Sequence, residues 1–344
     1  AYYDVPTPGL FNSFITKHQA NTAELFGYLG GTNYLVDKSD GTACSNFLAG
    51  TEWICLSEHT VGFPKDLDAY TYVGRSQRFM FFHNENAASA GLWLPAGIET
   101  IHETDPVEQY NALGNLYGIP ELFTSIETVY EGEDAAFTFE DVSGKELTFA
   151  QAKELYETET GNGMMSEISA LKMHISFEAP CDGQAYICGK DISSLGRVFA
   201  GERFETIVSY PNALNDFAKE YRIVICNEEA FTQFVACASP GELREPAYRN
   251  NALSGKVSCK EEGYVMLPMA YSSDMKVYVD GEEGEVEDLW ESVVFVKMPA
   301  GDHTVKLVFD PAGYYRCILF SVVVLLFDMG ILLLLKRKKN EGQA

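Results

Sequence analysis

The chain has 344 residues, 46% of them hydrophobic and 13% aromatic, which is enough for two or three domains with buried cores. It carries 25 Lys and Arg against 50 Asp and Glu, a formal net charge of −25. This charge excludes sequence-independent binding to nucleic acid, because such binding needs a basic surface that releases counterions. We therefore expect no nucleic acid partner.

The first 125 residues mix helix and strand patterns. Asp105 followed by Pro106 is typical of a helix start, and Gly30-Gly31 is typical of a helix end. Short apolar runs in the same region suit buried strands. The predicted elements are helices at 14–29 and 106–117 and strands at 53–56 and 78–82. We expect an α/β region over residues 1–125.

Residues 126–165 are acidic and are predicted to form a connector, with a helix at 149–157 and a turn at 161–163. From residue 166 to 312 the pattern changes to short apolar runs separated by Gly, Pro and Asp, which favours a β-sandwich or two in tandem. The predicted strands are 173–177, 184–187, 204–209, 221–226, 231–236, 264–270, 276–279, 293–297 and 304–309. The predicted fold class is thus α+β.

This strand region contains a weak internal repeat. The segment ISFEAPCDGQAYICG is similar in layout to VMLPMAYSSDMKVYVDG, and GERFETIVSYP is similar to AGDHTVKLVFDP. Asp280-Gly281 and Ala300-Gly301-Asp302 are typical of tight hairpin turns. Two halves of one sandwich and two small sandwiches are both compatible with the repeat.

The run CILFSVVVLLFDMGILLLL at 317–335 predicts a transmembrane helix over 316–336, because at ~1.5 Å per residue it covers about 28 Å. The basic residues Lys336–Lys339 follow it, so we expect a cytoplasmic tail at 337–344 and residues 1–315 on the outer side. Asp328 within the run indicates pairing with further helices, and a tolerated, protonated Asp is the alternative. The sequence begins at Ala1, without an initiator Met or a signal region, so we expect this chain to be a C-terminal piece of a longer protein.

No catalytic or cofactor motif stands out. The six His lack zinc-ligand spacing, and phosphate-binding glycine loops are absent, so no metal, cofactor or catalytic residue is assigned. Cys181/Cys188 and Cys226/Cys237 could each form a disulfide, but buried free thiols are the better expectation. Three tryptophans could stack on sugars, although core packing is the better expectation for each of Trp53, Trp93 and Trp290.

The segment from Tyr264 to Pro311 resembles the C-terminal signature of the YfhO family of bacterial membrane proteins. From this segment onwards the chain reads LPMAYSSDMKVYVDG, then PAGDHTVKLVFDPAGYYR, then the apolar run. Two earlier segments also resemble segments of the family, and all of them follow one another in the same order as in the family. They are NYLVDKSDGTACSNFLAGTEWICLSE and DPVEQYNALGNLYG. The chain departs from the family pattern at Asp274-Met275, where Gly-Trp is usual, and at residues 50–53.

The resemblance implies a multi-spanning protein of the bacterial cell membrane that is similar to GT-C glycosyltransferases. Such a protein moves a sugar from a polyprenyl-phosphate carrier to a cell-envelope polymer such as lipoteichoic acid, with its catalytic acid on early helices outside this chain. This chain would be the extracytoplasmic part, and envelope glycan and the remaining helices would be its partners. The positions that match the family motif are Gln109, Asn111, Asp280, Gly281, Gly301 and His303, and a structural role is the better expectation for each. Gln109 and Asn111 could instead face a sugar or the helices outside this chain.

Two other functions stay open. The chain could be a surface protein that binds glycan or protein and is held by a single C-terminal anchor. Asp328 counts against this function, because a charged residue does not stabilise a lone anchor. A self-contained outer hydrolase is a third possibility, but no motif points to it. Whether the chain by itself is an enzyme is left undecided.

Overall fold

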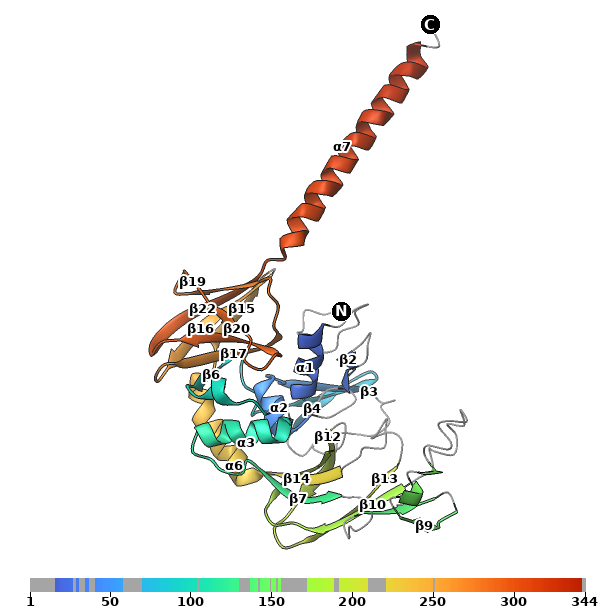
Figure 1. Ribbon diagram of the computed structural model, residues 1–344, viewed down its shortest axis with the longest axis vertical. Helices are drawn as coiled ribbons and strands as arrows, with labels where there is room; N and C mark the ends of the chain where they lie inside the picture. The colour runs from blue at the N-terminus through green and yellow to red at the C-terminus, as the bar shows by residue number, and fades with distance from the viewer. Residues whose placement is uncertain are drawn as a thin grey trace.

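The computed structural model describes residues 16–26, 29–30, 35–36, 41–57, 70–103, 105–129, 137–141, 143–148, 150–152, 154–155, 172–188, 192–209, 221–249 and 251–341. In this part of the chain, two β-sandwiches lie on either side of a layer of helices, and a long C-terminal helix projects from the second sandwich (Figure 1). The turn predicted at 161–163 lies outside the described residues.

The first sandwich packs two antiparallel four-stranded sheets face to face. The inner sheet, which faces the helices, has the order β12 (Ile192–Val198), β11 (Gly183–Cys188), β14 (Tyr221–Asn227), β7 (Phe123–Val129). The outer sheet has the order β13 (Arg203–Ser209), β10 (Lys172–Glu178), β8 (Phe137–Glu140), β9 (Glu146–Leu147). Met173, Ile187 and Ile225 belong to the core between the two sheets.

The second sandwich repeats this plan with a five-stranded outer sheet. That sheet has the order β15 (Arg244–Arg249), β16 (Ala252–Cys259), β22 (Gly301–Phe309), β18 (Met275–Val279), β19 (Glu282–Gly284). The inner sheet has the order β20 (Val286–Glu287), β21 (Val293–Met298), β17 (Gly263–Ala270), β6 (Leu92–Pro95). Val257, Val265 and Val296 lie in the core between them.

The helical layer explains why the inner strands β14, β17 and β21 carry apolar residues at successive positions. In β14, Ile223 and Ile225 face the sandwich core, whereas Val224 and Cys226 face the helices. Alternating side chains therefore enter two different cores, and the strand reads as a continuous apolar run. The helices that cover these faces are α1 (Lys17–Leu25), α2 (Ala43–Leu48), α3 (Pro106–Leu116) and α6 (Glu228–Ala238).

The repeat is real, but its first half is shifted by one strand from the predicted alignment. β10 pairs with β13 and β11 with β12, just as β16 pairs with β22 and β17 with β21. Gly183 opposite Val198 corresponds to Gly263 opposite Met298. The counterpart of the β10–β11 hairpin is thus β16–β17 and not β17–β18, whereas the predicted match of β13 with β22 is confirmed.

The α/β expectation for the N-terminal region is wrong. Its strands β3 (Trp53–Ser57), β5 (Phe79–His83) and β4 (Thr71–Ser76) form an antiparallel sheet, and β6 and β7 join the inner sheets of the two sandwiches antiparallel to their neighbours. The helix starting at Pro106 is confirmed, with the Asp105 carboxylate accepting from the backbone N–H groups of Val107 and Glu108. A two-stranded ribbon, β1 (Leu29–Gly30) with β2 (Leu35–Val36), adjoins α1.

The strand predicted at 231–236 is also wrong, because this segment is helix α6. Asn227 caps the helix by accepting a hydrogen bond from Ala230 N at 3.0 Å, and Glu228 and Glu229 occupy the first turn. These are favourable helix-start residues, so the local signal for a helix was present in the sequence. The hairpin turn predicted at Asp280-Gly281 is confirmed: it closes the β18–β19 hairpin with positive φ at both residues. The turn predicted at 300–302 does not close a hairpin, because it connects β21 and β22, which belong to different sheets.

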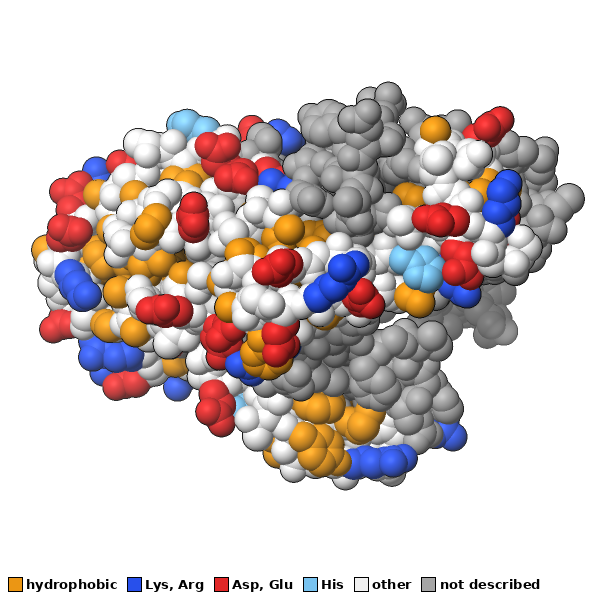
Figure 2. Space-filling model, turned by 90° about the horizontal axis from the view of Figure 1, so that it is seen from below, with side chains coloured by type: hydrophobic (Ala, Val, Ile, Leu, Met, Phe, Trp, Pro, Cys, Tyr) orange, Lys and Arg blue, Asp and Glu red, His pale blue; other side chains and the backbone are white. Residues whose placement is uncertain are grey.

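Charged side chains are dispersed over the surface. On the face in Figure 2, Asp and Glu side chains stand among uncharged ones, with Lys and Arg between them. Ion pairs of this kind include Arg203 with Glu205 at 2.8 Å and Lys256 with Glu245 at 2.7 Å. These pairs are solvent-exposed, so each stabilises the fold only slightly.

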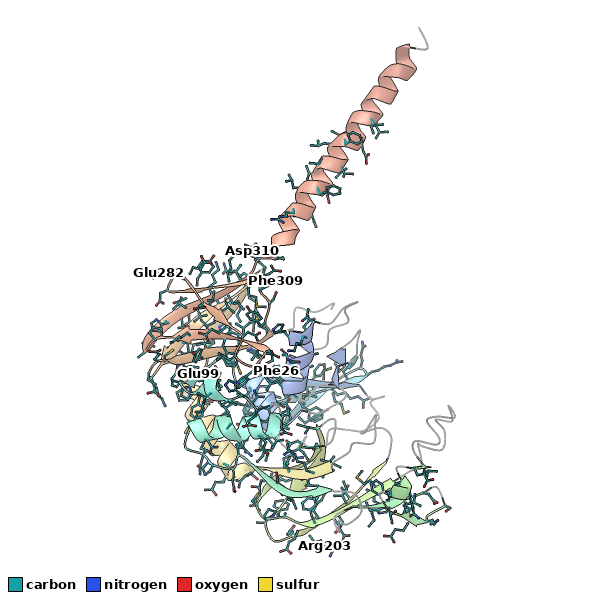
Figure 3. All side chains as sticks on the ribbon, in the orientation of Figure 1. Phe26, Glu99, Arg203, Glu282, Phe309 and Asp310 are labelled. Carbon is teal, nitrogen blue, oxygen red and sulfur yellow. The ribbon has the colours of Figure 1, made fainter. Side chains whose placement is uncertain are left out.

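Helix α7 (Ala312–Glu341) leaves the second sandwich beside Phe309 and Asp310 (Figure 3). Large apolar side chains on it are exposed, among them Leu319 and Phe320. Among the described residues, no helix is long and apolar enough to cross a membrane, and the predicted transmembrane helix at 316–336 is corrected accordingly. Asp328 and Gly330 interrupt the apolar run, and Lys336 begins a basic segment directly after it.

Candidate functional site

A pocket of about 530 Å³ lies where α1, the start of α3 and the segment 288–292 before β21 meet. Its apolar lining residues are Leu25, Ile101, Pro106, Leu289 and Trp290. Its polar lining residues are Asn21, His102, Glu103, Gln109, Glu291 and Ser292. The volume falls within the roughly 300–1,000 Å³ of small-molecule sites, and apolar walls with a few polar groups are usual for them.

Helix α1 is held against the segment 288–292 by polar contacts. His18 Nε2 lies 2.7 Å from Asp288 Oδ2, and Asn21 Nδ2 donates to the backbone oxygen of Glu291 at 2.9 Å. Lys17 forms an ion pair with the Glu291 side chain, and this hydrogen bond lowers the pKa of that carboxyl. The contacts join residues that are 270 to 274 apart in the sequence, so no local pattern could have predicted this wall.

The second wall is the first turn of α3. Asp105 accepts hydrogen bonds from Val107 N at 2.9 Å and Glu108 N at 3.1 Å, and Pro106 has no N–H. One turn further, Gln109 lines the pocket with only 7% of its surface exposed. Its side chain forms no hydrogen bond with another described residue, so the amide keeps both donor and acceptor capacity.

Two further polar atoms of the pocket lining have no hydrogen-bond partner among the described residues. They are the indole Nε1 of Trp290 and the hydroxyl Oγ of Ser292, and Ser292 is only 2% exposed. The Trp290 ring is held edge-on against Phe295, with ring centroids 5.0 Å apart. Buried polar groups without partners are uncommon because each costs about 1–3 kcal/mol, so these atoms favour a ligand or ordered water in the pocket.

Asn111, the other position singled out on α3, does not line the pocket. Its amide donates to Phe123 O at 3.1 Å and accepts from Phe123 N at 2.7 Å. The side chain thereby binds the first residue of β7 to the helix. This contact is a structural one that fixes the return of the chain into the first sandwich.

The remaining motif positions gather at the turn ends of the second sandwich. Asp280 accepts a hydrogen bond from His303 Nδ1 at 2.7 Å and one from Thr304 N at 2.8 Å. The hydrogen bond with Asp280 raises the pKa of His303, and the same bond lowers the pKa of Asp280. Gly281 and Gly301 both have positive φ, as turns of this kind need. These residues fix two turns and do not line the pocket.

The tryptophans divide between core and surface. Trp93 is 4% exposed and belongs to the core of the second sandwich, as expected. Trp290 is partly buried and lines the pocket. Trp53 is 47% exposed and lies against the His83 ring, with ring centroids 4.7 Å apart and the planes tilted by 55°, so core packing is wrong for this residue.

All eight cysteines are free thiols, so neither of the two candidate disulfides is formed. The expectation of buried thiols holds for Cys188 and Cys226, which face the helices, whereas Cys181 is half-buried and Cys237 is exposed. Cys44 and Cys259 are buried as well. Burial raises the pKa of Cys188 to about 12, which makes that thiol unreactive.

Asp328 is exposed on α7, and its predicted pairing with other helices has no counterpart among the described residues. No group of three or more His, Cys, Asp or Glu within the described ranges could hold a metal ion. His102, Glu103 and Ser292 of the pocket lining were not predicted, because nothing in their local sequence distinguishes them.

Comparison with known proteins gives one family-level finding. The model of the family described as bacterial membrane protein YfhO matches residues 193–321, from β12 into α7. The match includes Asp280, Gly281, Gly301 and His303, whereas Gln109 and Asn111 lie outside it. No curated protein and no solved structure matches the chain.

Proposed function

We propose that this chain is the extracytoplasmic part of a membrane-bound glycosyltransferase of the bacterial cell envelope. The enzyme would move a sugar from a polyprenyl-phosphate carrier to an envelope polymer such as lipoteichoic acid. The observation that carries the proposal is the match of the YfhO bacterial membrane protein model to residues 193–321, which include α6 and every strand of the second sandwich except β6. We assign the chain no catalytic residue.

The proposed task of the two sandwiches is to hold or guide the acceptor polymer near the transfer site. A net charge of −25 with dispersed acidic side chains disfavours direct contact with a phosphate-rich polymer, because like charges repel (Figure 2). Contact through uncharged sugar units, or through a local basic patch, avoids this repulsion. The pocket beside α3 is the described cavity that suits an uncharged unit.

The test is a bacterial strain in which the gene for the complete protein is deleted and then restored. We expect deletion to remove a sugar substituent from an envelope polymer, measured by sugar analysis of the purified polymer, and the polyprenyl-linked sugar to accumulate. Restoring the gene should reverse both effects. An unchanged sugar content on every envelope polymer would contradict the proposal, and loss of glycan adhesion alone would favour the surface-binding alternative.

A further inference from the structure

We infer that the pocket formed by α1, α3 and the segment 288–292 binds an uncharged saccharide unit. The inference begins with charge. The lining contains the carboxylates of Glu103 and Glu291 and no Lys or Arg, and Lys17 beside it is already paired with Glu291. A phosphate or carboxylate ligand would meet two carboxylates and, as the one basic side chain of the lining, the imidazole of His102, so an anion is disfavoured.

The pocket adjoins a helix N-terminus, which is otherwise a common anion site. Here the capping carboxylate of Asp105 already accepts from the N–H groups of Val107 and Glu108, and Pro106 offers no N–H. The positive end of α3 is therefore capped by the chain itself, and the guanidinium of Arg222 beside it is already paired with Asp105 and Glu108. This arrangement removes the remaining attraction for an anionic ligand.

The polar groups left over suit hydroxyls. The Gln109 amide can donate and accept, the Ser292 hydroxyl can donate and accept, and the Trp290 indole N–H donates. The Trp290 and Ser292 atoms are buried and have no partner among the described residues. A saccharide hydroxyl both donates and accepts, so one ring can pair with the Gln109 amide directly, and with the buried Trp290 and Ser292 atoms after a small turn of these side chains towards the cavity, without introducing a charge.

The apolar part of the lining suits the C–H faces of the same ring. Leu25, Ile101 and Leu289 lie beside Trp290 around the cavity, whose volume of about 530 Å³ accommodates a small ligand. Aromatic side chains with a polar N–H are well suited to ligands that are apolar on one side and polar on another. The biological role of this binding, as a hold on the acceptor, rests on the proposed function.

The experiment titrates the full chain, purified in detergent, with methyl glycosides of glucose, galactose and N-acetylglucosamine and with glucose 6-phosphate. Saturation-transfer NMR and calorimetry report binding. We expect at least one neutral glycoside to bind and the phosphate to bind at least about tenfold more weakly than glucoside. Gln109→Leu should weaken binding about tenfold, the effect of one lost hydrogen bond at ~1.4 kcal/mol. Trp290→Phe, which removes the indole N–H, should also weaken it.

Matched controls make the same changes outside the pocket. Gln233→Leu alters an exposed glutamine of α6, and Trp53→Phe alters an exposed tryptophan of β3. Both should bind as the unmodified chain does. The inference is overturned if no neutral glycoside binds, if the phosphate binds as tightly as the glucoside, or if the controls lose binding as strongly as the pocket variants.

The outcome is separable from that of the proposed function. Saccharide binding that the pocket variants abolish, in a protein whose gene deletion leaves every polymer unchanged, would support the pocket and refute the glycosyltransferase. Loss of the polymer sugar on deletion, with no saccharide bound by the chain, would support the glycosyltransferase and refute the pocket.

Discussion

His303 at the start of β22 donates a hydrogen bond of 2.7 Å to Asp280, which lies in the turn between β18 and β19. Asp280 also accepts from Thr304 N at 2.8 Å and donates its own N–H to Thr304 O at 2.9 Å. The turn of one hairpin is thereby fixed to the beginning of the neighbouring strand. Both residues lie in the part of the chain that the family model matches.

This pair predicts a pH dependence of stability. The pKa of His303 is raised above its ordinary value of 6.5. Its contribution to the free energy of unfolding is therefore complete below pH 6.5 and is lost as the pH rises through the folded-state pKa. The pKa of Asp280 is lowered below 3.8, so its contribution is present above that value and is lost as the pH falls through the folded-state pKa. The pair should therefore stabilise most between about pH 4 and 6.5.

The change that tests it is Asp280→Asn, which keeps a residue that tolerates the positive φ of this turn. We expect a small decrease in melting temperature at pH 5.5 and a smaller one at pH 9, measured by thermal unfolding. Asp302→Asn, which removes an exposed carboxylate in the neighbouring turn, should not reproduce this pH profile. An equal decrease at both pH values would show that the charge of the pair does not matter.

Asn111→Ala should destabilise the chain by about 1–3 kcal/mol, because it removes two hydrogen bonds and leaves the backbone of the buried Phe123 without its partner. Urea unfolding measures the free energy. Asn115→Ala, on the exposed side of the same helix, is the matched control and should change stability by less than about 0.5 kcal/mol. Similar effects of the two changes would contradict the role of Asn111.

Gly183 and Gly263, the equivalent first residues of β11 and β17, should each be intolerant of alanine. A Cβ at Gly183 would lie 2.1 Å from Cys226 O, and one at Gly263 would lie 2.4 Å from Leu94 O. Because backbone oxygens cannot move away without breaking the sheets, we expect a loss of more than about 2 kcal/mol for each. Denaturant unfolding of both variants tests this.

Gly74→Ala in β4 is the control for these two changes, since a Cβ there meets nothing within 4 Å. It should leave stability nearly unchanged. If Gly183→Ala and Gly263→Ala unfold at the same denaturant concentration as Gly74→Ala, the close approach of neighbouring strands at these positions is refuted.

Asn227→Ala should destabilise the chain by about 1 kcal/mol, because it removes the hydrogen bond that caps α6 through Ala230 N. Equilibrium unfolding followed by circular dichroism measures the change. Gln233→Ala within the same helix should have little effect, since this side chain is exposed. If Asn227→Ala leaves the free energy of unfolding unchanged, packing alone defines the start of α6.

Local sequence predicted much of the strand pattern but not how the strands are shared between sheets. The runs at 173–177 and 264–270 became β10 and β17, because apolar side chains at these positions have few alternatives to burial. The run at 231–236 is equally apolar, yet it became α6 after the cap at Asn227. An apolar run by itself does not distinguish a buried strand from a buried helix.

The candidate pocket could be predicted only in part. For Trp290 a contact with sugar was the alternative to core packing, and for Gln109 it was the alternative to a structural role, and both residues line the cavity. Ser292 was not, because a lone serine before a strand carries no signal. The contact of α1 with the segment 288–292 depends on long-range packing, as the bond between His18 and Asp288 illustrates.

The sequence by itself determined the acidic character of the chain, most strands, the Asp105-Pro106 helix start and the Asp280-Gly281 turn, because composition, side-chain alternation and turn chemistry act over a few residues. Only the tertiary structure decided that β6 and β7 join separate sandwiches and that the repeat pairs β10–β11 with β16–β17. It also decided that Gln109, Trp290 and Ser292 share one cavity. The physical reason is that sheet partners and cavity walls are selected by burial between distant segments, which no local pattern records.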